Sequence, residues 1–291
     1  MTQSPAIFGE VLFDCFEDGS RVLGGAPFNV AWHLQAFGCR PLLISRVGDD
    51  PMGKLIRETM LQWGMSAAGL QIDLSHASGE VEVTLKSGQP SFNIVEDRAY
   101  DHINAAAVPP LDASLIYHGT LALRNPESAA ALNHLLQSSQ TPVFMDVNLR
   151  PPWWNFEQTV KLLGRAKWVK VNDAELDILV EGSATQTRKA ELLMERHGLS
   201  WLVVTRGKQG AISLDNAGNL LEAKPAADTP VVDTVGAGDA FASVCILGLQ
   251  KDWPHGLILE RAQQFAAVLV GTRGATLNDP NPYAALLAEW R

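Results

Sequence analysis

Short apolar runs rich in β-branched residues alternate along the chain with longer segments of helical period. This alternation is typical of βα units arranged around a mostly parallel sheet. Most of the apolar runs are too short for surface helices, and their composition suits strands covered on both faces. Strands are expected at residues 6–13, 41–47, 114–119, 142–148, 167–172 and 201–207.

Helical signals lie between these strands. Residues 26–38 end in Gly38, residues 51–64 open on Pro51 and end in Gly64, and residues 172–180 start with Asn and Asp. Proline near the start and glycine just past the end are typical helix boundaries. The last third of the sequence adds two strongly apolar helices. No internal repeat or low-complexity linker interrupts the chain, so we expect a single domain over residues 1–291.

Residues 80–96 break the βα rhythm and predict a hairpin. Apolar residues alternate with polar ones on both sides of the turn SGQP (87–90): Val81, Val83, Leu85, Phe92 and Ile94. A hairpin with one apolar face cannot join a parallel sheet buried on both sides. We therefore expect it to project as a lid, built from about 10–23 and 78–100. Its apolar face would pack on a ligand cleft, on the early strand or on a second subunit. An edge hairpin resting on the domain body is the alternative.

Composition excludes several classes of protein. The chain has 291 residues, 46% of them apolar, and a formal net charge of −9, with no basic run, so nucleic acid is not an expected partner. The three cysteines, Cys15, Cys39 and Cys245, form no CxxC pair, which fits a reducing compartment better than a disulfide framework. We expect them to be small buried hydrophobic residues. The N-terminus lacks the pattern of a signal peptide, and no apolar run reaches the length of a membrane span. A cytoplasmic protein is expected.

The stretch DTVGAGDAF (233–241) carries the strongest chemical signal. Gly236, Ala237 and Gly238 stand where an apolar helix begins, and a helix N-terminus binds anions through its free N–H groups. A P-loop would continue with Lys and Ser or Thr, whereas this chain continues with Asp239 and Ala240. The glycine fingerprint of dinucleotide folds is also absent, because no third glycine follows.

A carboxylate beside an anion site has a use of its own. Asp239 is placed to accept the proton of a hydroxyl as that oxygen attacks a terminal phosphoryl group, while the N–H groups stabilise the transferred phosphate. The structural alternative is an acidic residue in the first turn of a helix, where the helix dipole favours it.

Two motifs together resemble the signatures of the PfkB family of carbohydrate kinases, the ribokinase-like enzymes. DTVGAGDAF resembles the second signature, and GGAPFNVAWHLQAFG (24–38) followed by Gly48 resembles the first. The resemblance covers nearly the whole chain and is closest to the fructokinase branch. Ser243-Val244 departs from it, because relatives more often carry two small residues there. The other matching segments are GEVLFDCF (9–16), DVNLRPPWW (146–154), VKVNDAE (169–175) and VVTRGKQGA (203–211).

The resemblance implies a fold and a catalytic turn. The expected fold is an α/β, ribokinase-like three-layer sandwich with a mostly parallel central sheet and a small β-sheet lid. Asp239 then corresponds to the catalytic base, and the N–H groups of Gly236, Ala237 and Gly238 to the anion hole.

The resemblance also implies positions that hold the sugar. Asp14, Gly25 and Asn29 match residues that bind sugar hydroxyls, and carboxylate and amide groups suit that task. Arg98 and Arg150 are weaker candidates for contact with sugar oxygens. The alternatives are a turn residue, a polar group at a helix start and surface arginines.

Nucleotide and metal sites are implied in the second half of the chain. Asn172 and Glu175 resemble the NxxE motif that organises Mg²⁺, through water, and the phosphates of ATP; the alternative is helix capping. Asp233 resembles part of a monovalent-cation site, for K⁺ for example. The further ATP-binding positions are Thr205, Gly207, Gly238 and Gly274.

The expected activity is transfer of the γ-phosphoryl group of ATP to a sugar hydroxyl, with fructose as first choice and fructose 6-phosphate as product. Alternatives are a kinase for another sugar or a sugar acid such as 2-keto-3-deoxygluconate, and a non-catalytic sugar-binding regulator. A dinucleotide oxidoreductase is disfavoured by the missing glycine fingerprint. Expected partners are the sugar and ATP, with a homodimer formed through the lid.

Overall fold

A nine-stranded sheet forms the centre of the protein in the computed structural model, which describes residues 3–86, 89–225 and 231–291. Every strand pair is parallel except β11–β12 and β12–β13, so the expected mostly parallel sheet is confirmed. The strands lie in the order β13 (Leu220–Ala223), β12 (Ala211–Asp215), β11 (Trp201–Thr205), β10 (Trp168–Asn172), β9 (Val143–Asp146), β8 (Ala113–His118), β1 (Ser4–Phe8), β4 (Leu42–Gly48) and β5 (Leu70–Asp73).

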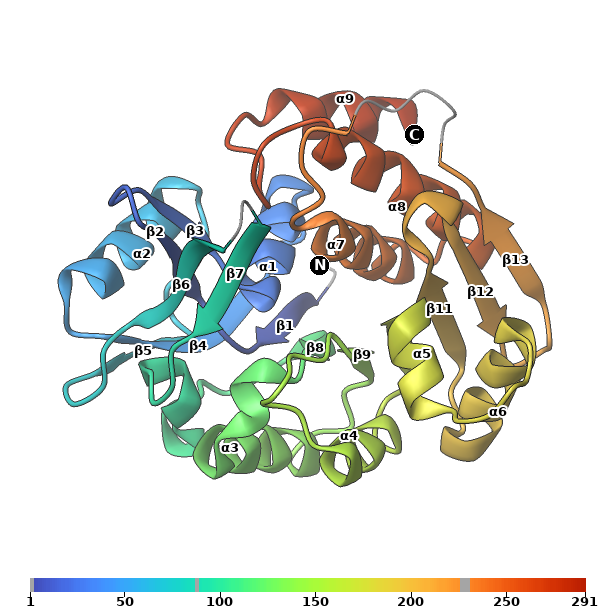
Figure 1. The fold of residues 1–291 in the computed structure, drawn as a ribbon, viewed down its shortest axis with the longest axis horizontal. Coiled ribbons are helices and arrows are strands. Elements are labelled where there is room, and N and C mark those ends of the chain that lie inside the picture. The colour runs from blue at the N-terminus through green and yellow to red at the C-terminus, as the bar shows by residue number, and fades with distance from the viewer. Residues whose placement is uncertain (1–2, 87–88, 226–230) are drawn as a thin grey trace.

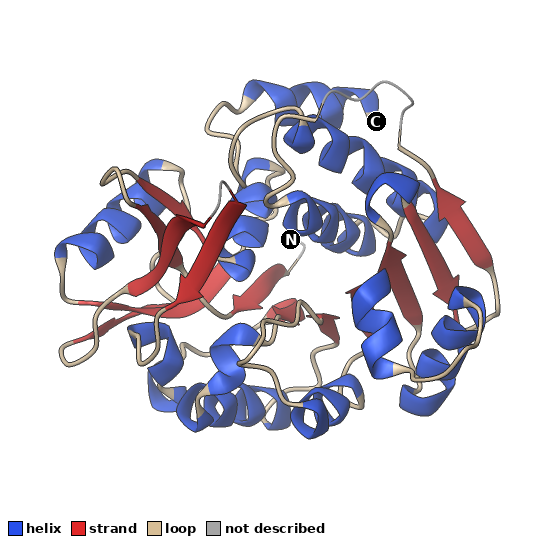
Figure 2. Cartoon of the chain, viewed as in Figure 1, coloured by secondary structure: helices blue, strands red, loops and turns tan. Residues whose placement is uncertain are grey.

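Helices cover both faces of this sheet and give the three layers that the sequence predicted (Figures 1 and 2). Side chains of a strand alternate between its faces, and in β1 Ile7 enters one core while Ala6 and Phe8 enter the other. None of the helices in the described ranges is long and apolar enough to cross a membrane. The helices on the Ile7 face of the sheet are α1 (Ala26–Ala36), α2 (Pro51–Gln62), α7 (Ala237–Gln250), α8 (His255–Val270) and α9 (Asn281–Glu289). The helices on the other face are α3 (Pro126–Gln137), α4 (Phe156–Leu163), α5 (Asp173–Leu179) and α6 (Gln186–His197).

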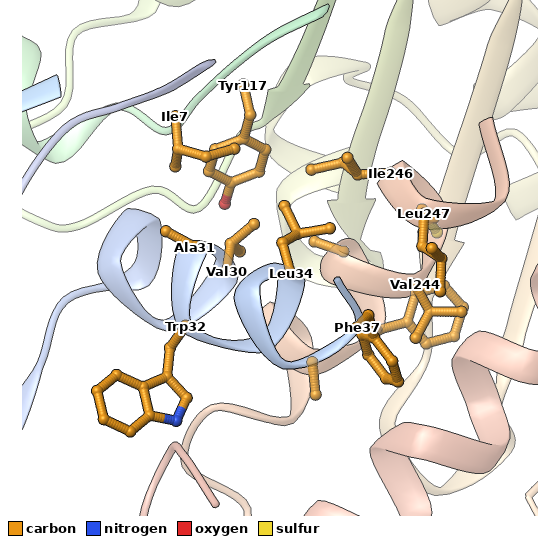
Figure 3. Packing of buried hydrophobic residues seen from close by; sticks show 14 of the residues in the cluster. Ile7, Val30, Ala31, Trp32, Leu34, Phe37, Tyr117, Val244, Ile246 and Leu247 are labelled. Atoms are coloured by element: carbon orange, nitrogen blue, oxygen red, sulfur yellow. The ribbon is translucent and has the colours of Figure 1, made fainter. Parts of the chain in front are cut away.

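The packing of α1 joins the sheet to α7. Figure 3 shows Val30 and Leu34 of α1 on the side of the helix that faces Ile7 and Tyr117, while Trp32 points away from these strands. Val30, Leu34, Ile7 and Tyr117 are all fully buried. Because α1 and α7 pack in one core, their N-termini are held in a fixed relation, and both carry candidate site residues.

The expected strand over 6–13 is wrong, because the chain leaves the large sheet within it. Strand β1 ends at Phe8, and β2 (Leu12–Phe16) belongs to a second sheet. Gly9 between them has a φ of 147°, and a Cβ there would lie 2.4 Å from Pro27 Cγ. Only glycine fits this turn against the start of α1. A continuous apolar run in the sequence does not reveal such a break.

The second sheet contains four strands in the order β3 (Arg21–Gly24), β2, β6 (Gly79–Lys86) and β7 (Gln89–Ile94). Strands β6 and β7 form the expected antiparallel hairpin. The early strand β2 pairs edge to edge with β6 in the same sheet, so it does not cover the apolar face of the hairpin as one of the alternatives predicted. Val81 and Val83 are buried against the body, whereas Phe92 is 57% exposed. Residues 87 and 88 of the expected SGQP turn lie outside the described residues.

Candidate active site

The candidate residues gather where the parallel strands end. In sheets of this kind, ligands bind at the carboxyl ends of strands, at the point where the strand order changes direction. Here that point lies between β1, which continues to β4 and β5 on one side, and β8, which continues to β9, β10 and β11 on the other. The chain leaves β1 into the small sheet at the same place.

The glycine turn forms the N-terminus of α7, as predicted. Gly236 is the N-cap residue in left-handed conformation, with a φ of 77°, and a Cβ there would lie 2.5 Å from Ala275 Cα. A larger residue therefore fits neither the backbone nor the space. No side chain in the described part of the chain caps this helix. The Ala237 N–H, one of the three expected donors, donates to the Thr234 carbonyl over 3.3 Å, so the N–H groups of Gly238 and Asp239 are the ones that face an anion.

Asp239 lies in the first turn of α7 and meets the first turns of α1. Asn29 Nδ2 donates a 2.8 Å hydrogen bond to Asp239 Oδ2, across 210 residues of sequence. Burial raises the pKa of Asp239 to about 6, although the Asn29 hydrogen bond and the nearby Lys170 oppose the shift. A carboxylate with a pKa near 6 is mostly ionised at neutral pH and a stronger base than an ordinary aspartate.

The expected sugar-binding residues come together beside this pair. A Cβ placed on Gly24 would lie 3.8 Å from Asp14 Oδ2 and 4.0 Å from Asn29 Oδ1, so both oxygens face the same small space. Asn29 Oδ1 is buried, and no described residue donates a hydrogen bond to it. Burial raises the pKa of Asp14 to about 6. Gly25 adjoins them, where a Cβ would lie 2.8 Å from Glu10 O. An unpartnered buried acceptor fits the hydroxyl of a ligand.

Glu10 is a further candidate that the sequence analysis missed. It follows β1 and is 3% exposed, and its Oε2 is buried without a hydrogen-bond partner among the described residues. Burial raises its pKa to about 7, with Arg150 opposing the shift and Asp239 adding to it. The available signal was a carboxylate inside the apolar run AIFGEVLF, since a buried acid is rarely found without a task.

A buried ion pair lies under the turn and was also missed. Lys170 Nζ on β10 donates to both oxygens of Asp146 at the end of β9, over 2.9 and 2.8 Å. A Cβ on Gly238 would lie 3.4 Å from Lys170 Nζ, so the ammonium adjoins the start of α7. Burial disfavours the charge of Lys170, but Asp146 outweighs it and raises the lysine pKa. Charged residues in the apolar strands PVFMDVN and KWVKVN were the signal for this pair.

Asn172 and Glu175 form the capping box of α5, the structural alternative weighed above. Asn172 Oδ1 accepts from the Glu175 N–H over 2.8 Å, and Glu175 Oε2 accepts from the Asn172 N–H over 2.9 Å. Glu175 Oε1 accepts from the Leu149 N–H. Each carboxylate oxygen keeps a second lone pair, so capping does not exclude contact with a hydrated metal ion. Burial raises the pKa of Glu175.

The remaining nucleotide-site candidates lie on two segments. Thr205, at the end of β11, pairs in register with Asn172, and Gly207 opens the next short 3-10 helix. Gly274 donates its N–H to Asp233 Oδ2 over 3.1 Å, and Val235 donates to Asp233 Oδ1. Asp233 thus ties the segment around Gly274 to the loop that enters α7.

The two arginines differ in position. Arg150 lies close enough to the carboxylates of Glu10 and Asp239 to lower the pKa of both. Arg98 Nη2 instead pairs with Glu80 Oε2 over 3.2 Å, and no contact in the described part of the chain joins it to Asp239. Ser243, at the departure from the family pattern, is fully buried and donates its hydroxyl to the Ala240 carbonyl.

The sequence and the structure are similar to those of known sugar kinases. The chain is 27% identical to fructokinase-2 of Oryza sativa subsp. japonica, covering 84% of this chain and 79% of that protein. It is 28% identical to the aminoimidazole riboside kinase of Salmonella typhimurium, covering 89% and 85%. A double mutant of the Vibrio cholerae O395 fructokinase, solved with fructose, ADP and potassium ion, superposes with a TM-score of 0.84 at 23% identity, covering 100% and 99%.

These likenesses agree with the fold. The sequence profile described as "pfkB family carbohydrate kinase" matches residues 14–282, which is nearly the whole chain. This span includes the N-terminal ends of both α1 and α7, from which Asn29 and Asp239 meet. The chain therefore belongs to the pfkB family of carbohydrate kinases.

Proposed function

We propose that the protein transfers the γ-phosphoryl group of ATP to a hydroxyl of a neutral sugar, and that this sugar is fructose. The observation that carries the proposal is the placement of Asp239. Its carboxylate lies in the first turn of an uncapped helix, and Asn29 holds it over a 2.8 Å hydrogen bond. A base and an anion site then lie at one point, as in-line phosphoryl transfer requires.

The protein's own groups supply the steps around the transfer. Asp239 accepts the proton of the attacking hydroxyl, and Asn29 fixes the orientation of its carboxylate. The N–H groups of Gly238 and Asp239 stabilise the charge on the transferred phosphoryl group. Lys170 adds positive potential beneath the turn, reduced by its pairing with Asp146.

The residues present fit ATP·Mg²⁺. Glu175 and Asn172 at the start of α5 would hold a hydrated magnesium ion through their oxygens, a donor set that Mg²⁺ prefers. The ion would neutralise charge on the phosphates of ATP. Thr205, Gly207 and Gly274 would line the nucleotide. Asp233 would take part in a monovalent-cation site such as one for K⁺.

Local charge favours a neutral sugar over a sugar acid. Asp14, Glu10 and Asp239 place three carboxyl groups at the site, and Arg150 is the guanidinium whose charge acts on Glu10 and Asp239. A carboxylate substrate such as 2-keto-3-deoxygluconate would meet this negative potential. Sugar hydroxyls, by contrast, can donate to the buried acceptors Asn29 Oδ1 and Glu10 Oε2. Fructose is chosen because fructokinases are among the relatives.

The small sheet completes the proposal. Strand β2 carries Asp14 at the site, so closure of this sheet as a lid would exclude water that otherwise hydrolyses ATP. Its apolar residues Phe16, Val22 and Phe92 are 37%, 41% and 57% exposed, and the strand register places them on the same face as Asp14. We propose that they meet a second copy in a homodimer and that the enzyme acts in the cytoplasm.

The test is ADP release from ATP·Mg²⁺ with a panel of free sugars, aminoimidazole riboside and sugar acids. Turnover with fructose should fall by several orders of magnitude in Asp239→Asn. The control is Asp252→Asn, which changes an exposed carboxylate just beyond the other end of α7. Turnover with another acceptor would keep the kinase and discard fructose. Sugar binding without ADP release from any acceptor would overturn the catalytic proposal.

A further inference from the structure

Two histidines and an aspartate meet at a place remote in sequence from the catalytic turn. His76 lies in the loop between β5 and β6, Asp97 in the loop after β7, and His102 ends the short 3-10 helix 99–102. One potential ligand atom of each residue lies within 4.8 Å of those of the other two. His102 Nε2 lies 2.8 Å and His76 Nε2 3.8 Å from Asp97 Oδ1.

The opposite nitrogen of each histidine ring faces a carboxylate. His76 Nδ1 lies 3.0 Å from Asp73 Oδ2, and His102 Nδ1 lies 2.8 Å from Glu127 Oε2. When Nδ1 donates to a carboxylate, the lone pair of a neutral imidazole stands on Nε2. This carboxylate–histidine arrangement is the usual outer shell of a metal-binding histidine. Here it occurs twice, and both Nε2 atoms face the same Asp97 oxygen.

Charge balance points the same way. Asp73, Asp97 and Glu127 contribute three negative charges, and Arg46 contributes one positive charge, 2.9 Å from Asp73 and 4.0 Å from Glu127. With both imidazoles neutral, two negative charges remain, which one divalent cation would neutralise. Nearby Arg124 pairs with Asp101 and leaves this sum unchanged.

We propose that His76, Asp97 and His102 bind a divalent transition-metal ion, with Zn²⁺ as the first candidate. Imidazole nitrogen with carboxylate oxygen selects zinc and its neighbours over Mg²⁺, which prefers oxygen alone. Metal–ligand bonds of about 2.0–2.1 Å in a tetrahedral site separate neighbouring ligand atoms by roughly 3.4 Å. The two Nε2–Oδ1 distances, 2.8 and 3.8 Å, lie on either side of that separation.

Binding would require a small rearrangement of the rings. His76 and His102 are stacked, with centroids 3.7 Å apart and planes 13° from parallel, so their Nε2 lone pairs run side by side. An ion held by both draws the rings out of this stack. The Asp97 side chain is 71% exposed, which leaves room for the ion and for water as a fourth ligand.

The site would fasten the hairpin to the body of the protein. His76 lies on the segment that enters β6, while Asp97 and His102 lie on the segment that leaves β7. In Figure 1 these strands belong to the small sheet, with β4 and β5 close by. A shared ion would join the two ends of the hairpin. This role is independent of phosphoryl transfer at Asp239.

Zn²⁺ titration of the metal-free full chain tests the proposal by calorimetry, with Co²⁺ as an absorbing substitute. We expect one ion per chain, visible d–d bands with Co²⁺, and no competition from excess Mg²⁺. Affinity should fall at least about ten-fold in His76→Gln, His102→Gln and Asp97→Asn, because each removes or weakens a ligand. His134→Gln, at an exposed site on α3, is the matched control and should bind as the unchanged chain does.

Acid should weaken binding, because the metal must displace protons. Zinc affinity should therefore decrease from pH 8 to pH 6. The exposed Asp97→Asn variant keeps the test valid if a histidine variant fails to fold. Equal affinity in all variants, or no saturable binding to the unchanged chain, would overturn the proposal.

Discussion

Replacing Asp239 with asparagine should stabilise the folded protein at pH 8 while it removes the proposed base. Burial raises the pKa of Asp239 from 3.8 to about 6. Between these two pH values the folded state binds more protons than the unfolded state, so stability falls as pH rises through this window. Above pH 6 the whole cost of holding the buried carboxylate is present. An amide carries no charge and avoids it.

The magnitude follows from the size of the shift. A rise of roughly two pKa units at 1.36 kcal/mol each corresponds to about 3 kcal/mol of stability lost by the native chain at pH 8. The new amide oxygen can still accept the hydrogen bond from Asn29 Nδ2, which spans 2.8 Å in the native protein. At roughly 2 °C per kcal/mol for a chain of this size, the unfolding midpoint should rise by about 6 °C.

Calorimetric unfolding at a series of pH values from 4 to 8 measures this difference. It should be near zero at pH 4, grow up to pH 6 and then stay constant. Asp252→Asn, which changes an exposed carboxylate, should show no such growth. An Asp239→Asn chain that is no more stable than the native chain at pH 8, or a gain in stability that does not depend on pH, would refute a destabilising buried charge at this position.

Four further substitutions test the same site. Asn29→Ala removes a hydrogen bond that lowers the pKa of Asp239, so the acidic limb of kcat/KM for ADP release should move up from about 6 by roughly one to two pH units. Glu10→Gln should leave the limb in place, because Glu10 has a pKa of about 7 and is mostly uncharged at the pH where Asp239 titrates. A limb that Asn29→Ala does not move contradicts Asp239 as the base. Lys170→Met leaves Asp146 buried and unpaired and should cost about 3–5 kcal/mol in urea unfolding. Adding Asp146→Asn should restore much of the lost free energy of unfolding. A Lys170→Met variant as stable as the native chain would contradict a charged pair at this place.

Local sequence signals located most of the secondary structure. Gly38 and Gly64 follow the ends of α1 and α2, and Pro51 occupies the first turn of α2, as expected. The alternation in 80–96 identified the hairpin, and the glycine turn identified the start of α7. These features depend on residues a few positions apart, where backbone preference and hydrophobic period act directly.

Contacts between segments that are distant in the sequence could not be predicted from such local signals. The run 6–13 reads as one strand, yet the approach of Pro27 to Gly9 divides it between two sheets. Arg98 was expected to contact sugar oxygens, but its guanidinium pairs with Glu80 on β6 of the hairpin. The capping roles of Asn172 and Glu175 were foreseen as an alternative, because a capping box spans only three residues.

The amino-acid sequence by itself determined the family, the mostly parallel sheet and the turn that bears Asp239, since motif spacing and hydrophobic period are written along the chain. Only the tertiary structure decided which groups meet that turn: Asn29 from 210 residues away, buried Glu10, and the Asp146–Lys170 pair from two neighbouring strands. The pKa of Asp239 depends on burial, and burial is created only when the sheet and helices close around the carboxylate.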